Sequence, residues 1–370
     1  MKILAIETSC DETGISILEA EGGLGAPHFS MLSEEVVSQL ELHTHWGGVV
    51  PNLAKREHQR ALVPVLKAAL EKALLLKPRF QQCSTLLDLG AILTREPDLV
   101  TALTAFLEQY ETPEIDAIAV THGPGLEPAL WVGINCAKAL AAVWQKPLIP
   151  VNHMEGHIYA GLAENAPIAF PALALLVSGG HTELVLVKNW REYEILGSTR
   201  DDAVGEAFDK VARILGLPYP GGPAISKLAK LPTDFMLPAP LPRPMIGSGD
   251  YSFSFSGLKT AVLYLVQKLE HTSNTLSPTS SISDVVKIAI AKEFQTAAID
   301  VLLAKSKEAL EEHEAKTFII GGGVSANKEL RRRAADMIAQ DFSDITLSIP
   351  PAHLSTDNGT MIGVAGYIRL

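Results

Sequence analysis

Short apolar runs alternate with longer amphipathic stretches along the whole chain. The short runs are rich in Ile, Val, Leu and Ala and are bounded by polar residues, glycine or proline, which is typical of buried strands. The pattern predicts strands at 2–7, 14–19, 115–120, 147–151 and 317–323, and a strand, glycine turn and strand over 172–187. Helices are predicted over 54–76, 130–145 and 325–340, with one more opening at His153. These strand–loop–helix units indicate an α/β fold with mixed sheets.

Three glycine-rich turns join the predicted elements: Ser178–Thr182, Gly321–Asn327 and Pro220–Pro223. Glycine lets backbone N–H groups approach an anion closely, and a helix N-terminus adds a favourable dipole. Tight turns also need glycine for conformational reasons alone, so one such turn would be a weak signal. None of the three matches the phosphate-loop or dinucleotide fingerprints.

The order of these elements resembles the duplicated ribonuclease-H-like fold of the superfamily that holds actin, heat-shock chaperones and sugar kinases (ASKHA). The first predicted hairpin has an acidic polar tip between Glu7 and Gly14, and the second has a glycine tip. In that superfamily the two hairpin tips hold phosphates and a late glycine loop holds adenosine. The resemblance therefore implies two duplicated lobes and a nucleotide site.

Composition places the chain among soluble globular enzymes of two lobes, with 370 residues, 47% hydrophobic and 20% charged. No apolar run is long enough to cross a bilayer, and no signal peptide is evident. The three cysteines form no close pair, so a cytoplasmic location is expected. The net charge of −11 means that the chain as a whole repels phosphate groups. It could therefore bind nucleic acid only through a local basic patch or with the help of a partner protein. Residues 55–60 and 328–333 are candidates, although each alone is more typical of a solvated helix face.

Three stretches interrupt the regular pattern. Residues 78–113 are an inserted segment, apolar enough to form extra helices. Residues 271–284 are rich in Ser and Thr and are expected to be mobile. The many prolines of 232–244 predict an extended loop.

His153 and His157 stand four residues apart, a spacing that places both rings on one helix face. Two neutral imidazoles so placed can ligate one divalent metal. The segment differs from the zinc-protease signature, in which the glutamate follows the first histidine directly. Here Glu155 points roughly 180° away from the pair, so it is poorly placed to serve a metal that the two rings hold. A pair of surface histidines is the alternative for the spacing taken alone.

Nine segments in order along the chain resemble the bacterial branch of the tRNA N6-adenosine threonylcarbamoyltransferase (TsaD) family. The resemblance covers nearly the whole chain except 78–113, 271–284 and the end. The segments are IETSCDETGISI (6–17), HTHWGGVVPNLAKREH (43–58), THGPGLEPAL (121–130), VNHMEGH (151–157), LLVSGGHTEL (175–184), DDAVGEAFDKVARILGLPYPGGP (201–223), FSFSGLKTAV (253–262), GGGVSAN (321–327) and STDNGTMI (355–362).

The resemblance implies a site of three parts. His153, His157 and Asp357 would hold one divalent metal, and this donor set suits Fe²⁺ best, with Zn²⁺ or Mg²⁺ as alternatives. Asp11 and His181 would lie near the reacting phosphate as candidate catalytic groups, and Glu12 is a weaker candidate. The substrate-binding residues would be Leu176, Val177, Ser178, Gly179, Gly180, Asp209, Gly222 and Asn327.

The reaction implied is transfer of the threonylcarbamoyl group from threonylcarbamoyl-AMP to N6 of adenosine 37 in tRNAs that read ANN codons, with release of AMP. The implied partners are the paralogue TsaB, which would bind the N-terminal lobe, the ATPase TsaE and the tRNA substrate, with no membrane. The N-terminal lobe is expected over 1–150 together with a C-terminal helix at 357–370. The C-terminal lobe, over 151–356, is expected to carry the metal and nucleotide sites.

Three other classes of protein remain as alternatives. A metallopeptidase would need Glu155 as its base, and a sugar or acid kinase would need a catalytic aspartate but no histidine pair. A non-catalytic scaffold, as TsaB-like paralogues are, would be expected to lack the metal ligands.

Overall fold

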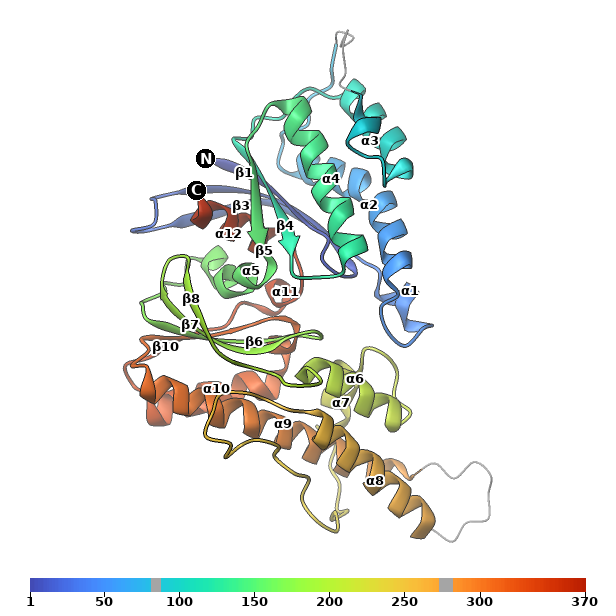
Figure 1. Ribbon diagram of the computed structural model, residues 1–370, viewed down its shortest axis with the longest axis vertical. Helices are drawn as coiled ribbons and strands as arrows, with labels where there is room; N and C mark the ends of the chain where they lie inside the picture. Colours follow the sequence, from blue (N-terminus) through green and yellow to red (C-terminus); the bar gives the residue numbers. More distant parts are fainter. Residues whose placement is uncertain (81–87, 273–281) are drawn as a thin grey trace. The chain divides into compact units, whose positions relative to one another are not determined.

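The computed structural model describes residues 1–80, 88–272 and 282–370 and divides into two compact units (Figure 1). The first unit comprises Met1–Pro167 and His353–Leu370, and the second comprises Ile168–Ala352. The second unit is thus inserted into the first along the chain. A short helix, α11 (Ala352–Ser355), crosses the second boundary.

The first unit is built on a five-stranded mixed sheet of order β3-β2-β1-β4-β5. The first three strands are antiparallel, whereas β4 and β5 run parallel to β1. Its strands are β1 (Lys2–Glu7), β2 (Glu12–Glu21), β3 (His28–Ser38), β4 (Ala117–Gly123) and β5 (Leu148–Asn152). Its helices are α1 (Leu40–Thr44), α2 (Pro51–Lys72), η1 (Leu89–Ala91), α3 (Pro97–Gln109), α4 (Glu127–Trp144), α5 (His153–Tyr159), η2 (Ala160–Glu164) and α12 (Gly359–Arg369).

The second unit repeats this topology on a sheet of order β10-β9-β6-β7-β8. Strands β6, β7 and β8 are antiparallel, and β9 and β10 run parallel to β6. Its strands are β6 (Ala172–Val177), β7 (Thr182–Asn189), β8 (Glu192–Ser198), β9 (Thr317–Gly321) and β10 (Thr346–Ser348). Its helices are α6 (Val204–Ile214), α7 (Gly221–Leu228), α8 (Ser256–Thr272), α9 (Asp284–Glu312), η3 (Gly323–Ala326) and α10 (Lys328–Asp341). The shared strand order confirms the predicted duplication.

Helices cover both faces of the first sheet. Buried side chains of α2, α3 and α4 pack with Leu4 and Ile6 of β1 in one hydrophobic core. On the other face α12 lies close to the strands because its glycines face them: a Cβ at Gly363 would stand 2.3 Å from Leu18 Cδ2, and one at Gly359 2.5 Å from Ser16 N. This close approach fixes the start of α12, where Asp357 lies.

The predicted strands and helices are confirmed in kind, with shifted ends. The helix predicted over 54–76 is α2 and ends at Lys72, and the helix predicted over 325–340 begins as the 3₁₀ turn η3. The edge strand β3 was not predicted because its alternation is blurred by polar residues on a half-exposed surface. Residues 232–244 form neither helix nor strand, as expected. Most of 271–284, with its expected mobility, lies outside the described residues.

The boundary between the units differs from the predicted one at 150. Contacts of α5 and η2 with α12, and of η2 with β3, tie the chain up to Pro167 to the first sheet. His153 and His157 therefore belong to the first unit, together with Asp357, and not to the C-terminal lobe.

Two further expectations concern the insertion and the membrane. Within 78–113, η1 and α3 supply the extra helical structure predicted there, and residues 81–87 lie outside the described part. None of the described helices combines the length and the apolar character that a membrane span requires.

Candidate functional site

Two helix caps position the His–His–Asp group in the first unit. Asn152 ends β5 and caps α5, since its Oδ1 accepts hydrogen bonds from the N–H groups of Met154 (2.8 Å) and Glu155 (3.4 Å). This cap makes His153 the first residue of α5 and puts His157 one turn later. Asn358 caps α12 in the same way through Met361 N at 2.9 Å, so Asp357 lies directly before the helix.

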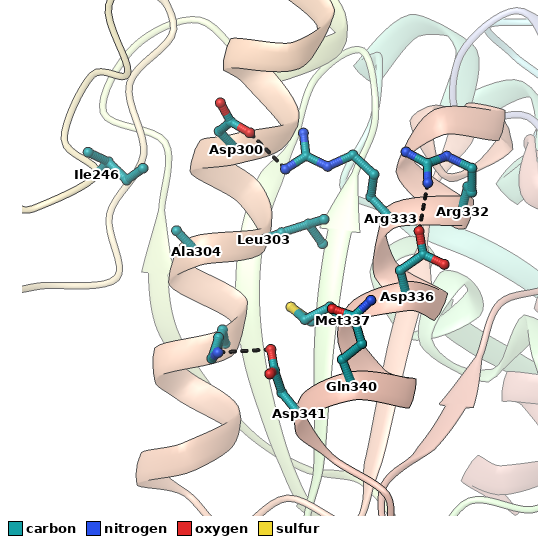
Figure 2. Close-up of a pocket in the computed structure, with 11 residues that line it drawn as sticks. Ile246, Asp300, Leu303, Ala304, Arg332, Arg333, Asp336, Met337, Gln340 and Asp341 are labelled. Carbon is teal, nitrogen blue, oxygen red and sulfur yellow. Dashed lines mark hydrogen bonds and ion pairs between the residues drawn. The ribbon is translucent and has the colours of Figure 1, made fainter.

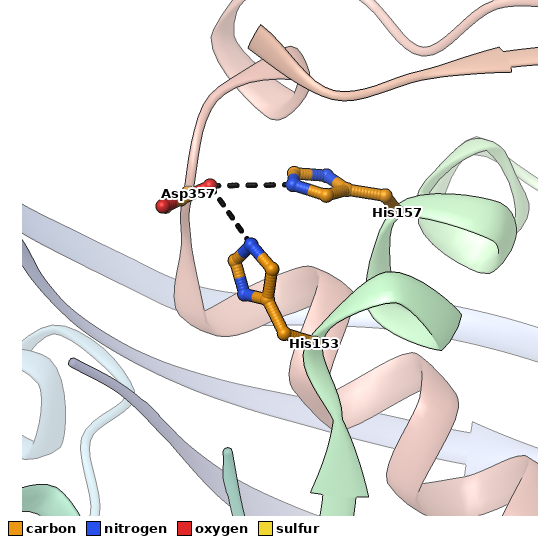
Figure 3. A group of neighbouring side chains, drawn as sticks. All are labelled: His153, His157 and Asp357. Atoms are coloured by element: carbon orange, nitrogen blue, oxygen red, sulfur yellow. Dashed lines mark ion pairs between the residues drawn. The ribbon is translucent and has the colours of Figure 1, made fainter. Parts of the chain in front are cut away.

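The three predicted metal ligands converge in the structure (Figure 3). Asp357 Oδ1 lies 3.3 Å from His157 Nε2 and 3.5 Å from His153 Nε2. One potential ligand atom from each residue lies within 4.8 Å of the other two. The histidine rings stand edge to face, with centroids 4.6 Å apart.

The group fits a divalent metal. Nitrogen and oxygen ligands at 2.0–2.1 Å from a tetrahedral metal lie about 3.3 Å from one another. The ring of His157 is buried, yet among the described residues neither of its nitrogens has a hydrogen-bond partner. The ion-pair contact of Nε2 with Asp357 does not replace a hydrogen bond, and burying an imidazole without one is costly, so a metal bound at Nε2 would remove part of that cost. Three protein ligands also leave a coordination position for substrate.

The charges within the group are strongly coupled. Burial disfavours the charged form of His153, but the carboxylates of Asp357 and Glu7 outweigh it and raise its pKa to about 9. Burial likewise acts against the charged form of Asp357, but His153 and His157 hold the pKa of that carboxyl well below its usual range. Without metal, the site therefore holds a histidinium beside a carboxylate.

We expect metal affinity to weaken as the pH falls below about 9, the pKa of His153 in the metal-free fold. His153 must lose its proton to ligate, so the apparent affinity should fall about tenfold per pH unit. The free energy of unfolding of the metal-free chain changes with pH in the opposite direction. The raised pKa of His153 stabilises this fold fully below the unfolded pKa of 6.5, and the stabilisation is lost as the pH rises through about 9. Calorimetric titration with Zn²⁺ in buffers of different ionisation enthalpy measures the released proton. An affinity that does not change across this window would contradict the charge assignment.

Glu155 is turned away from the His–His–Asp group and is bound by an arginine. Its two carboxylate oxygens accept hydrogen bonds from Arg369 Nε at 2.6 Å and Nη2 at 2.7 Å. This bidentate pair joins α5 to the end of α12. The prediction from helix geometry is confirmed, and Glu155 is not placed to act as the base that a metallopeptidase requires.

Replacing Arg369 by Ala should lower the free energy of unfolding by about 3 kcal/mol, because it leaves the buried Glu155 carboxylate without a partner. Urea unfolding of the metal-free chain measures this. The matched control replaces Glu155 and Arg369 together by Leu, which should recover most of the loss. An Arg369→Ala chain as stable as the unmodified one would show that the pair contributes nothing.

In the second unit, contacts form a ring that brings the predicted substrate-binding residues together. The N–H of Gly205 in α6 donates to Ser178 O at 3.2 Å, and the N–H of Gly221 in α7 donates to Asp209 at 2.7 Å. Asn327 Nδ2 donates to Ser226 Oγ of α7 at 3.0 Å. Gly322 closes the ring, since its Cβ position would lie 2.4 Å from Val177 O.

Four glycines beside this ring of contacts are not required there by packing or by backbone conformation. A Cβ added at Gly179, Gly180, Gly222 or Gly323 would meet nothing within 4 Å, and none of them has a positive φ. Neither packing nor backbone conformation explains glycine at these positions. A ligand that approaches the backbone closely would explain it, so these residues form what we call the glycine cradle.

The other predicted substrate residues have mixed roles. Leu176 and Val177 are fully buried, so their side chains serve the core. Asn327 Oδ1 caps α10 through Glu329 N at 2.9 Å, which fixes the orientation of its amide. Burial raises the pKa of Asp209, against the hydrogen bonds from Gly221 and Gly222.

Asp11 and His181, the candidate catalytic pair, lie in different units. Asp11 is buried at the tip of the first hairpin, and His181 closes the second, where its N–H donates to Ser178 Oγ at 3.0 Å. Burial and the neighbouring carboxylates of Asp11 and Asp357 raise the pKa of Glu12. The structure therefore places Asp11 and His181 each within its own unit, and it gives no distance between them on which a joint role could be argued.

Ion pairs compensate part of the positive charge in the two candidate basic patches. A hollow of about 540 Å³ between α9 and α10 is lined by Arg332 and Arg333, but these pair with Asp336 (2.6 Å) and Asp300 (2.7 Å) (Figure 2). In the other patch Arg60 pairs with Glu57 at 2.8 Å. These pairs compensate part of the positive charge of each segment, as is common on solvated helix faces.

The fold and the site define an ASKHA-type α/β protein with a His–His–Asp group in one unit and a glycine cradle in the other. A sequence model described as "TsaD: tRNA N6-adenosine threonylcarbamoyltransferase" matches residues 30–81 and 97–364. The chain belongs to this family, and it is a transferase that forms threonylcarbamoyl-adenosine in tRNA.

Curated relatives agree with this family. Proteins named tRNA N6-adenosine threonylcarbamoyltransferase are similar over the full chain in Persephonella marina (44% identical, 90% of the relative covered) and in Chromobacterium violaceum (42% identical, 93% covered). The family model leaves 82–96 unmatched, a shorter stretch than the predicted insertion 78–113, so α3 lies within the matched part.

Among solved structures, full-length HypF in its phosphate- and nucleotide-bound form superposes with a TM-score of 0.53 at 12% identity. The match covers 99% of this chain and 46% of HypF. At this identity the likeness concerns the fold alone, and it supports the ASKHA-type architecture.

Proposed function

We propose that the chain transfers the threonylcarbamoyl group of threonylcarbamoyl-AMP to N6 of adenosine 37 in tRNAs that read ANN codons, releasing AMP. The observation that carries the proposal is the convergence of His153, His157 and Asp357 in a member of this family. The metal they would hold, Fe²⁺ first and Zn²⁺ or Mg²⁺ as alternatives, supplies a Lewis acid for the oxygens of the threonylcarbamoyl group.

The chain's own residues would bind and orient the adenylate. A Cβ at Gly179 or Gly180 would meet nothing within 4 Å, so a phosphate could approach the backbone there. Their N–H groups, of which that of Gly180 also donates to Ser178 Oγ at 3.3 Å, would stabilise the charge that grows as AMP leaves. Asp209 would accept hydrogen bonds from ribose hydroxyls, and Asn327 would face the base. The attacking N6 amine belongs to an adenine in the unpaired anticodon loop, where it is accessible without opening a duplex.

The proposed partners are the paralogue TsaB, which would bind the N-terminal lobe, and the ATPase TsaE. The apolar side chains of α3, among them Leu99, Leu103 and Phe106, are buried in the first unit's own core. The apolar side chains of α3 are thereby accounted for, so they are no argument for an extension of the TsaB interface. A net charge of −11 predicts weak tRNA binding by this chain without its partners.

The test is incubation of the purified chain with threonylcarbamoyl-AMP, an adenosine-37 tRNA, TsaB and TsaE, followed by nucleoside mass analysis. Threonylcarbamoyl-adenosine should appear and should be lost on chelation. Product formation from threonine, bicarbonate and ATP, but never from the adenylate, would contradict the proposed donor. Product on a tRNA that reads codons with another first base would contradict the proposed codon range.

A further inference from the structure

Glu7, which no sequence pattern singled out, contacts His153 of the His–His–Asp group. It ends β1, is fully buried, and its Oε2 lies 3.2 Å from His153 Nδ1. Thr121 Oγ1 donates to the same oxygen at 2.5 Å. The N–H of Ser9 donates to the other oxygen, Oε1. Both oxygens of the carboxylate are therefore engaged.

The carboxylate determines which ring nitrogen of His153 carries a proton. An ionised carboxylate only accepts hydrogen bonds, so the facing Nδ1 must be protonated. In a neutral imidazole that leaves the lone pair on Nε2, the atom that lies 3.5 Å from Asp357 Oδ1. Nε2 is the nitrogen that points to the position a metal would take (Figure 3).

We propose that Glu7 is a positioning residue, which fixes the proton of His153 on Nδ1 and so presents Nε2 to the metal. The inference rests on the metal site of the proposed function. Carboxylates that hold the second nitrogen of a ligating histidine set its tautomer and raise its basicity. In this chain the carboxylate comes from the first strand of the unit and the histidine from α5, so the contact also fixes α5 against the sheet.

The substitution Glu7→Gln tests the tautomer directly, because the Ser9 N–H decides how the new amide is oriented. That N–H requires an oxygen in the position of Oε1, so the NH₂ group takes the position of Oε2. The NH₂ group then donates to His153 Nδ1, which must lose its proton and give it to Nε2. The substitution keeps the shape of the side chain at position 7 but places a proton on His153 Nε2, the atom that would bind the metal.

The experiment measures Co²⁺ affinity by calorimetry and by visible absorption for the unmodified chain, Glu7→Gln and Thr121→Val. Glu7→Gln should bind 10–100-fold more weakly. Thr121→Val removes the other donor to Oε2 but leaves the carboxylate, so its affinity should stay within about threefold, a loss of about 0.7 kcal/mol at most. Circular dichroism checks that each variant is folded. In the metal-free chain at a pH where His153 is neutral, its ¹⁵N shifts should report Nδ1–H for the parent and Nε2–H for Glu7→Gln.

Equal Co²⁺ affinity in the parent and Glu7→Gln, or an unchanged His153 tautomer, would overturn the role of Glu7 while the metal site stands. A parent chain that binds no Co²⁺ would instead remove the metal from the proposed function, and the role of Glu7 with it. Neither result depends on transfer activity, so a failure of the proposed donor or codon range is recorded separately.

Discussion

Asp357→Ala should reduce threonylcarbamoyl transfer at least about 1000-fold while the chain remains folded. Asp357 supplies the only carboxylate of the His–His–Asp group within the described residues, and its oxygen lies between the two imidazoles. A Lewis-acidic metal contributes several kcal/mol to a transition state, and about 4 kcal/mol corresponds to about 1000-fold in rate. Nucleoside mass analysis of the complete reaction measures the loss, and metal analysis of the purified variant measures the cause.

Two variants make this result interpretable. The double variant His153→Ala, His157→Ala should lose activity and metal to the same degree, since it removes the other two ligands. Glu164→Ala, which removes an exposed carboxylate of the same unit, should change neither. Transfer at the parental rate by Asp357→Ala without bound metal would eliminate the metal assignment.

Gly222→Val should weaken binding of AMP at least about 100-fold, which corresponds to about 2.7 kcal/mol. The valine side chain would fill space that is open in the structure, where a Cβ meets nothing within 4 Å. Because that space is open, the free energy of unfolding should change by less than about 1 kcal/mol. Calorimetric titration with AMP and thermal unfolding give the two quantities.

Two other glycines serve as controls for the cradle. Gly247 also faces open space but lies outside the ring of contacts, so Gly247→Val should leave AMP binding unchanged. Gly221 is crowded, since its Cβ would stand 2.6 Å from Asp209 Cα and 2.7 Å from Phe208 O, so Gly221→Ala should lower stability by about 1–3 kcal/mol. AMP affinity that Gly222→Val leaves intact would show that the nucleotide lies elsewhere.

The short apolar runs of the sequence predicted most of the strands in the two sheets, for a physical reason. Central strands such as β1, β4 and β6 are buried on both faces, so they appear in the sequence as continuous apolar runs. The edge strand β3 is half-exposed and carries Glu34 and Glu35, which obscures its pattern. The boundary near 167 was missed because it depends on which surface α5 packs against, and no local pattern records that.

The candidate site was predictable only in part. The spacing of His153 and His157 indicated a shared helix face, and helix geometry also showed that Glu155 points elsewhere. Asp357 came from the family resemblance, because an aspartate before a helix is usually a turn or cap residue. Glu7 gave no signal, since a glutamate at the end of a strand is ordinary until the fold brings it beside His153.

The insertion of the second unit within the first has a consequence for biosynthesis. A ribosome delivers both histidines first, then the whole of residues 168–352, and only afterwards Asp357 and α12. No contiguous piece of the chain that stops before Asp357 carries all three ligands. A metal held by all three residues would therefore bind late, after the chain has returned to its first sheet. The ion would link α5 to the start of α12 only in the completely synthesised chain. Products of incomplete translation or of proteolysis that lack Asp357 would not bind it through all three residues.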